Sequence, residues 1–158
     1  GTVQDNILGY LNRHPYFEKA PPKSTGKEEF GRKLVEQLVK KIDIETEQDF
    51  KNLIATLTYF TPETIYTSYQ KYFADKYPLD EIIVSGGGAQ NPAIMKGLKE
   101  LFEDVAFKAP PIYGLNIDAK ESLAFAILAA LRIWEIPANV PNATGAARPV
   151  LLGKIIYQ

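Results

Sequence analysis

The sequence predicts an α/β fold in which a helix-rich N-terminal half precedes a small sheet flanked by helices. Two observations carry this prediction. Apolar residues recur at helical spacing through most of residues 1–78, with capping and proline signals between the segments. From residue 79 onward the order becomes a short β-branched segment, three glycines, a helical segment and a second short apolar segment. That order is typical of a strand–helix–strand unit.

The amino-acid composition excludes several classes of function. The chain has 158 residues, 46% hydrophobic and 23% charged, with a net charge of −1 and no cysteine. These values predict a single globular domain without disulfides or thiolate metal sites, and they argue against nucleic acid or an anionic membrane as a partner. The longest apolar run, residues 123–131, is about half of a membrane span. The N-terminal residues do not show the basic segment followed by an apolar segment that is typical of a signal peptide. We therefore expect a cytoplasmic protein.

Residues 1–45 are predicted to form a helix, a proline-rich loop and a second helix. Apolar residues at helical spacing indicate the first helix over residues 4–13 and the second over residues 27–40. Residues 16–26 show neither helical nor strand periodicity and contain two prolines, which indicates an extended loop.

Residues 46–78 are predicted to be helical, as two consecutive helices. Thr46, with an acidic residue three positions later, is an N-cap signal for a helix ending near Tyr59. The run Thr61-Pro62-Glu63 is a second start signal, with a capping hydroxyl, proline in the first turn and an acid after it. The second helix is expected to end near Pro78.

Residues 79–158 are predicted to be the α/β part of the chain. A strand over residues 81–85 runs into Gly86, Gly87 and Gly88, and Asn91 caps the helix that follows. A second strand is expected at residues 105–107.

Further along, residues 118–134 are apolar almost all round, which indicates a helix buried between layers. A loop that includes Pro110-Pro111 is expected before this helix. After the helix and a stretch rich in Pro, Asn and Gly (residues 137–145), the apolar segments 150–153 and 155–157 predict a terminal strand.

The glycine turn is the strongest local signal for chemistry. Three glycines between a strand and a helix N-terminus let a ligand approach the backbone, and the free amides there favour phosphate. The run matches neither the dinucleotide fingerprint nor a P-loop. A tight strand–helix turn without a ligand remains the alternative.

Glu121 is the second candidate. It falls in the first turn of the helix expected over residues 118–134, where a carboxylate interacts favourably with the helix dipole whether or not it has a function. The functional alternative is a carboxylate on a rigid helix that holds a sugar hydroxyl or a water molecule.

Five segments together give the chain a resemblance to the anhydro-N-acetylmuramic acid kinase family. The resemblance covers essentially the whole chain, in order. The segments are His14-Pro15-Tyr16-Phe17, Pro21-Pro22-Lys23-Ser24-Thr25-Gly26-Lys27-Glu28, Val84-Ser85-Gly86-Gly87-Gly88-Ala89-Gln90-Asn91-Pro92, Asp118-Ala119-Lys120-Glu121-Ser122-Leu123-Ala124-Phe125-Ala126, and the closing run from Asn139 to Gly153.

The resemblance implies the C-terminal lobe of a two-lobed, actin-like (ribonuclease H-like) ATPase fold of the sugar kinase/Hsp70/actin superfamily. Members use ATP, with Mg²⁺, and water to convert 1,6-anhydro-N-acetylmuramic acid into the 6-phosphate during cell-wall recycling. By this resemblance Gly86, Gly87, Gly88 and Asn91 face the nucleotide. Glu121 lies near the sugar and the attacking water. No metal ligand is assigned in this chain.

The same resemblance implies that the whole chain, residues 1–158, is one lobe. The family's N-terminal lobe, with its phosphate turn and general-base aspartate, has no counterpart here, so we expect these residues alone to be inactive. Expected partners are ATP, the anhydro-amino-sugar, the absent lobe and a second copy of the chain. The alternative function is a non-catalytic module that binds a sugar or a protein.

Overall fold

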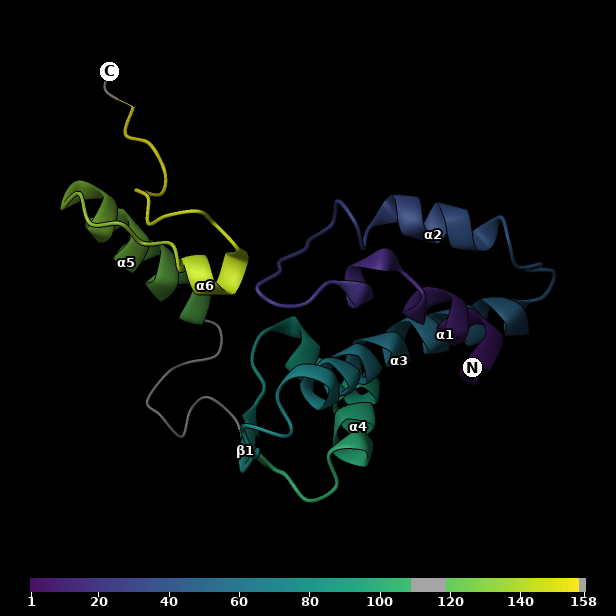
Figure 1. The fold of residues 1–158 in the computed structure, drawn as a ribbon. Coiled ribbons are helices and arrows are strands. Elements are labelled where there is room, and N and C mark those ends of the chain that lie inside the picture. The colour runs from purple at the N-terminus through teal and green to yellow at the C-terminus, as the bar shows by residue number, and fades with distance from the viewer. Residues whose placement is uncertain (109–118, 157–158) are drawn as a thin grey trace. The chain divides into compact units, whose positions relative to one another are not determined.

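The computed structural model describes residues 1–108 and 119–156 (Figure 1). The chain divides into two compact units, each described here by itself: unit 1 is Gly1–Ala20 with Thr25–Lys108, and unit 2 is Pro21–Ser24 with Ala109–Gln158. The elements in chain order are α1 (Asp5–Asn12), the 3₁₀ turn η1 (Pro15–Glu18), α2 (Arg32–Val39), α3 (Glu47–Tyr72), β1 (Glu81–Ile83), the 3₁₀ turn η2 (Gly87–Gln90), α4 (Pro92–Leu101), β2 (Ala106–Lys108), α5 (Lys120–Ile133) and α6 (Pro141–Thr144).

The two helices predicted in residues 1–45 are confirmed as α1 and α2, but α2 begins five residues later than expected. Gly31 precedes it with extended backbone (φ −130°, ψ −154°), and residues 27–31 form turns and a bend. The intervening loop contains η1. Its N-cap is His14, whose side chain accepts a hydrogen bond from the Tyr16 amide at 3.3 Å.

The break predicted at Thr61-Pro62-Glu63 is wrong, because α3 is one continuous helix of 26 residues. Its N-terminus is as predicted: Thr46 Oγ1 accepts from the Asp49 amide at 3.1 Å, and Asp49 Oδ2 accepts from the Thr46 amide at 2.9 Å. Pro62 costs the helix one backbone donor, but its ring is fully buried against α4, next to Gly97. Tertiary packing therefore overrides the local signal for a new helix at Thr61.

Leucine and isoleucine side chains from three helices form the core of unit 1. Thr56 of α3 is also fully buried: its hydroxyl donates to the Asn52 carbonyl at 2.7 Å and accepts from the Gln4 amide at 2.9 Å. This pair of bonds joins the start of α1 to α3. The core cluster consists of Ile7, Leu11, Leu34, Leu38 and Leu53.

The small sheet is confirmed as two parallel strands joined through α4. Glu81 pairs with Ala106 and Ile83 pairs with Lys108. Both strands lie within two residues of the predicted bounds at each end. The chain is thus α/β, mostly helical, with a two-stranded parallel sheet among the residues described.

Unit 2 contains α5, whose helical structure is confirmed and whose predicted burial is wrong. The expected start at Asp118 lies outside the described residues, as does the Pro110-Pro111 loop. Phe125 is 71% exposed and Trp134, which caps the C-terminus, is 67% exposed. Apolar residues all round a helix favour burial, but burial needs packing partners, and the described residues of unit 2 bury no α5 side chain.

The predicted terminal strand is also wrong for residues 150–156, and Tyr157 lies outside the described residues. A strand needs a continuous ladder of backbone bonds. Here the Ala138 amide donates to the Val150 carbonyl at 3.3 Å, but the Val150 amide donates to the Asn139 side chain instead. None of the helices described is both long and apolar enough to cross a bilayer.

Candidate functional site

The glycine turn joins β1 to α4 and starts with a conformation that only glycine adopts readily. Gly86 has φ +81° and ψ −171°, a region closed to side-chain-bearing residues. The Ala89 amide donates to the Gly86 carbonyl at 3.1 Å, and the Asn91 amide donates to the Gly88 carbonyl at 3.1 Å. The turn is therefore held by its own backbone, as the sequence predicts.

Gly87 and Gly88 differ from Gly86, because neither has a positive φ. A Cβ built on either residue meets no atom of the structure within 4 Å, and both residues are exposed. Among the residues described, no acceptor takes the amide hydrogen of Gly87 or of Gly88. Neither strain nor crowding within the described chain requires glycine at these two positions. Both are exposed residues whose amides donate to no acceptor among the residues described.

Asn91 is the N-cap of α4. Its Oδ1 accepts from the Ala93 amide at 3.0 Å and from the Ile94 amide at 3.4 Å. The side chain thus uses its acceptor on the helix, and its Nδ2 donor group has no partner in the part of the chain that the structure describes. This local role accounts for asparagine before Pro92 and keeps the turn aligned with the helix N-terminus.

Glu121 lies in the first turn of α5 and is exposed. The residue before the helix, Ala119, provides no side-chain cap, and Glu121 is the acidic residue in the first turn of α5, where a carboxylate interacts favourably with the helix dipole. Glu121 belongs to unit 2 and the glycine turn belongs to unit 1. The predicted site residues therefore fall into two groups that the structure describes separately.

Glu63 is a notable residue that the sequence did not single out. Its Oε2 atom is buried without a hydrogen-bond partner among the described residues. Burial raises the pKa of the Glu63 carboxyl above its usual value, the nearby Asp5 charge raises it further, and hydrogen bonding by Asn12 acts in the opposite direction. The sequence prediction placed Glu63 as an ordinary first-turn acid because it began a new helix at Thr61.

The described residues contain no recognisable metal-binding site. No group of three or more His, Asp or Glu side chains there could hold a metal ion. Among these residues the glycine turn offers hydrogen-bond donors instead, which is the chemistry that suits an anion.

The fold and the turn together define an α/β protein in which a glycine turn joins a strand to a helix N-terminus. The chain belongs to the anhydro-N-acetylmuramic acid kinase family, whose model matches residues 1–158. It is 40% identical over 161 residues to a protein named anhydro-N-acetylmuramic acid kinase from Bacillus thuringiensis subsp. konkukian, and 39% identical to the protein of that name from Bacillus cereus strain AH820. In both comparisons the alignment covers 99% of this chain and 41% of the relative. The chain therefore spans about 41% of the length of these curated relatives.

Proposed function

We propose that this chain is the ATP-binding C-terminal lobe of a kinase that converts 1,6-anhydro-N-acetylmuramic acid into N-acetylmuramic acid 6-phosphate. The observation that carries the proposal is the strand–glycine turn–helix unit, with two exposed unpaired amides, in a chain whose whole length matches this kinase family. The relatives bear the name of that activity and are more than twice as long as this chain.

The proposed architecture is a single lobe, residues 1–158, of an actin-like two-lobed protein. The small parallel sheet and its helices are compatible with part of such a lobe. The other lobe would then supply the phosphate turn and the general-base aspartate expected from the family. Because phosphoryl transfer needs in-line positioning, metal and base together, this chain alone should not turn over substrate.

In the proposed site the amides of Gly87 and Gly88 donate to the phosphate oxygens of ATP, and Asn91 holds the turn against α4. Mg²⁺ accompanies the nucleotide, with ligands outside the residues described. ATP supplies the phosphoryl group. Glu121 orients a sugar hydroxyl or the attacking water, a role that suits an exposed carboxylate on a rigid helix.

Nucleotide binding can be tested on the chain itself. Titration with ATP, followed by backbone amide shifts, should move the signals of Gly86 to Asn91 with a dissociation constant on the order of millimolar, about −4 kcal/mol. Gly87→Val should abolish these shifts, because it places a branched side chain over the donors. Gly9→Ala, which adds a Cβ in α1 with only the Arg13 side chain near it, is the matched control. Silent amides across the turn would contradict nucleotide binding by this lobe.

The activity itself needs a chain extended to the length of the relatives. That chain should phosphorylate the anhydro-sugar with ATP, and Glu121→Gln should lower turnover while leaving the glycine-turn shifts unchanged. Absence of ATP-dependent phosphorylation in the extended chain would overturn the kinase proposal.

We also propose that the chain associates with a second copy of itself. This proposal holds whether the chain is a kinase lobe or a non-catalytic module. The exposed apolar side chains of α5 favour it, since Phe125, Ile127 and Ile133 are each more than half exposed. Sedimentation should show a dimer or larger species at micromolar concentration that Phe125→Ser dissociates. A monomer throughout that range would contradict the proposal.

A further inference from the structure

The single histidine of the chain, His14, lies where α1 ends and the turn η1 begins. Its side chain is 24% exposed, and its ring packs against two phenylalanine rings. The centroid of the imidazole lies 4.8 Å from that of Phe30 and 6.4 Å from that of Phe17. These contacts fix the position of the imidazole within unit 1.

The Nδ1 atom of His14 has two partners. It accepts a hydrogen bond from the Tyr16 amide at 3.3 Å, which caps the N-terminus of η1. The same atom lies 3.7 Å from Glu29 Oε2. An imidazole nitrogen carries either a lone pair or a hydrogen in the plane of its ring, so Nδ1 accepts from the amide only when it is unprotonated. When Nδ1 is protonated it donates instead, and Glu29 is the acceptor within reach. The two contacts therefore exclude each other.

The charged groups around His14 favour Glu29 as the partner of the protonated ring. Within the part of the chain that the structure describes, Glu29 is the one carboxylate within 4.0 Å of the imidazole. Lys19 lies 3.9 Å from the other carboxylate oxygen, Oε1, and so leaves Oε2 to His14. The guanidinium of Arg13, the preceding residue, lies close to Gly9, one turn back along α1.

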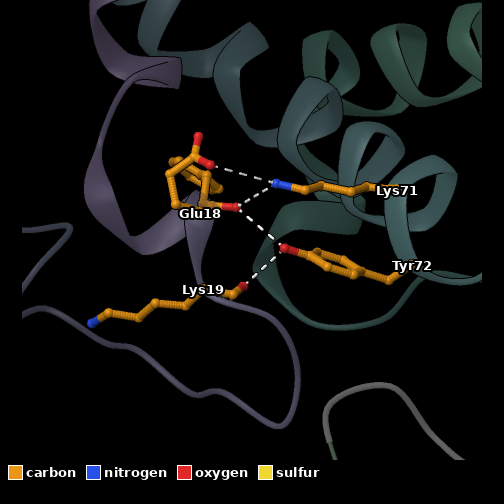
Figure 2. A network of polar contacts seen from close by, with 5 residues as sticks. Glu18, Lys19, Lys71 and Tyr72 are labelled. Atoms are coloured by element: carbon orange, nitrogen blue, oxygen red, sulfur yellow. Dashed lines mark hydrogen bonds and ion pairs between the residues drawn. The ribbon is translucent and has the colours of Figure 1, made fainter.

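The C-terminal end of η1 is attached to α3 (Figure 2). Lys71 Nζ donates to the Phe17 carbonyl at 3.1 Å, and the Tyr72 hydroxyl donates to the Lys19 carbonyl at 2.9 Å. Lys71 Nζ also lies 4.0 Å from the Glu18 carboxylate, so these two charges of α3 and η1 face each other. These contacts hold the C-terminal end of η1 whatever the protonation state of the imidazole.

The turn η1 also forms part of the wall of an apolar cavity in unit 1. The cavity has a volume of about 700 Å³, and none of the described residues that line it is charged. Tyr16 and Phe17 contribute to its wall from η1, Leu34 from α2 and Phe60 from α3. The Phe17 ring centroid lies 5.7 Å from that of Phe60. A rearrangement of η1 therefore changes the wall of this cavity.

We propose that His14 is a pH-sensitive switch for η1. The neutral ring caps η1, whereas the protonated ring releases the Tyr16 amide, binds Glu29 and loosens this wall of the apolar cavity. The proton comes from solvent, and histidine is the side chain that ordinarily changes charge between about pH 5 and pH 8. Loss of an N-cap typically changes the equilibrium constant of a helix end by about two- to thirtyfold, whereas an exposed ion pair returns about fivefold or less. The switch does not depend on the proposed nucleotide site.

Amide hydrogen exchange of the chain tests the switch. The Phe17 amide donates to the His14 carbonyl and the Lys19 amide donates to the Tyr16 carbonyl, so both amides report on η1. Their protection factors, which correct the exchange rates for the intrinsic effect of pH, should fall by about threefold or more between about pH 8 and about pH 5.5. The Leu53 amide, in the α3 core, is the internal reference for global unfolding, and its protection should not fall.

Substitutions of the histidine separate capping from charge. His14→Asn supplies a side-chain oxygen that accepts from the same amide and does not titrate, so its η1 amides should keep the high protection of the parent at both pH values. His14→Ala has no acceptor and should show the lower protection at both. No fall in the parent, or the same fall in His14→Asn as in the parent, would overturn the proposal.

Glu29→Gln tests the second partner of the ring. This variant lacks the charge that attracts the protonated imidazole, so more acid should be needed for the same fall in protection. Glu36→Gln, at an exposed α2 residue paired with Arg32, is the matched control and should follow the parent. An unchanged pH dependence in Glu29→Gln would overturn the role of Glu29 as the acceptor.

Discussion

Unit 1 and unit 2 differ in how they use apolar residues. All the buried hydrophobic side chains among the described residues belong to unit 1, where α1, α2, α3 and α4 pack together. Unit 2 has the more apolar helix, α5, yet none of its described side chains is buried. The difference teaches that an apolar pattern decides whether a helix forms, whereas burial depends on the surfaces that reach it.

Leucine residues show the same difference in burial between the two units. Leu53 of α3 is 3% exposed and lies among leucines from two other helices, whereas Leu123 of α5 is 47% exposed. Both leucines occur in strongly predicted helices. Only their surroundings distinguish them.

The largest expected effect comes from truncating this matched pair. Leu53→Ala should lower the free energy of unfolding by about 2–5 kcal/mol, because it removes buried methyl groups and leaves a cavity. Leu123→Ala should change it by no more than about 0.5 kcal/mol, as is usual for an exposed position. Urea unfolding of both variants, at a protein concentration at which the chain is monomeric, measures the two values. A large loss for Leu123→Ala would mean that α5 is packed in solution, and would break the comparison.

Two glycines provide a second matched pair, this time within unit 1. A Cβ at Gly97 would lie 2.8 Å from Pro62 Cγ, so Gly97→Ala should destabilise the α3–α4 contact by about 1–3 kcal/mol. Gly88→Ala meets open space and has no positive φ, so its effect on unfolding should be within about 0.5 kcal/mol. Thermal unfolding of the two variants tests this. Equal midpoints would show that the Pro62–Gly97 contact does not hold the continuous α3 helix.

The smallest expected effect is a pH dependence that originates in unit 1. The folded-state pKa of Glu63 is raised above its usual 4.5, chiefly by burial, with the Asp5 charge second among the raising causes. The folded state therefore binds the proton more tightly than the unfolded state, so this contribution to stability is fully present below the unfolded pKa and is lost as pH rises through the folded pKa. Glu63→Gln should gain stability relative to the parent as pH rises from about 4 towards neutrality.

Unfolding curves of both proteins across that pH range give the measurement. Because burial is the main cause, most of the effect should persist in about 1 M salt, where charge–charge interactions beyond about 3 Å are screened. A parent protein that gains stability with pH relative to Glu63→Gln would contradict the burial of this carboxyl.

Several elements could be predicted from the sequence because their causes are local. The capping box of α3 depends only on Thr46 and Asp49, and the start of α4 depends only on Asn91 and Pro92. The turn at Gly86 requires a φ that glycine alone adopts without strain. In each case the residues that make the structure are within a few positions of one another. The candidate glycine-turn site was visible for the same reason.

Other features were decided by contacts between distant segments. The helix α3 continues through Pro62 because α4 brings Gly97 against the proline ring, and no pattern near residue 62 records that contact. The backbone of residues 17–19 lies against α3 because Lys71 and Tyr72 donate hydrogen bonds to its carbonyls. The exposure of α5 and the absence of a strand in residues 150–156 also follow from which surfaces meet. Sequence by itself determined where helices, caps and the glycine turn occur, because propensity and capping act over a few residues. Tertiary structure alone decided what is buried, because burial depends on surfaces that are far apart in the chain.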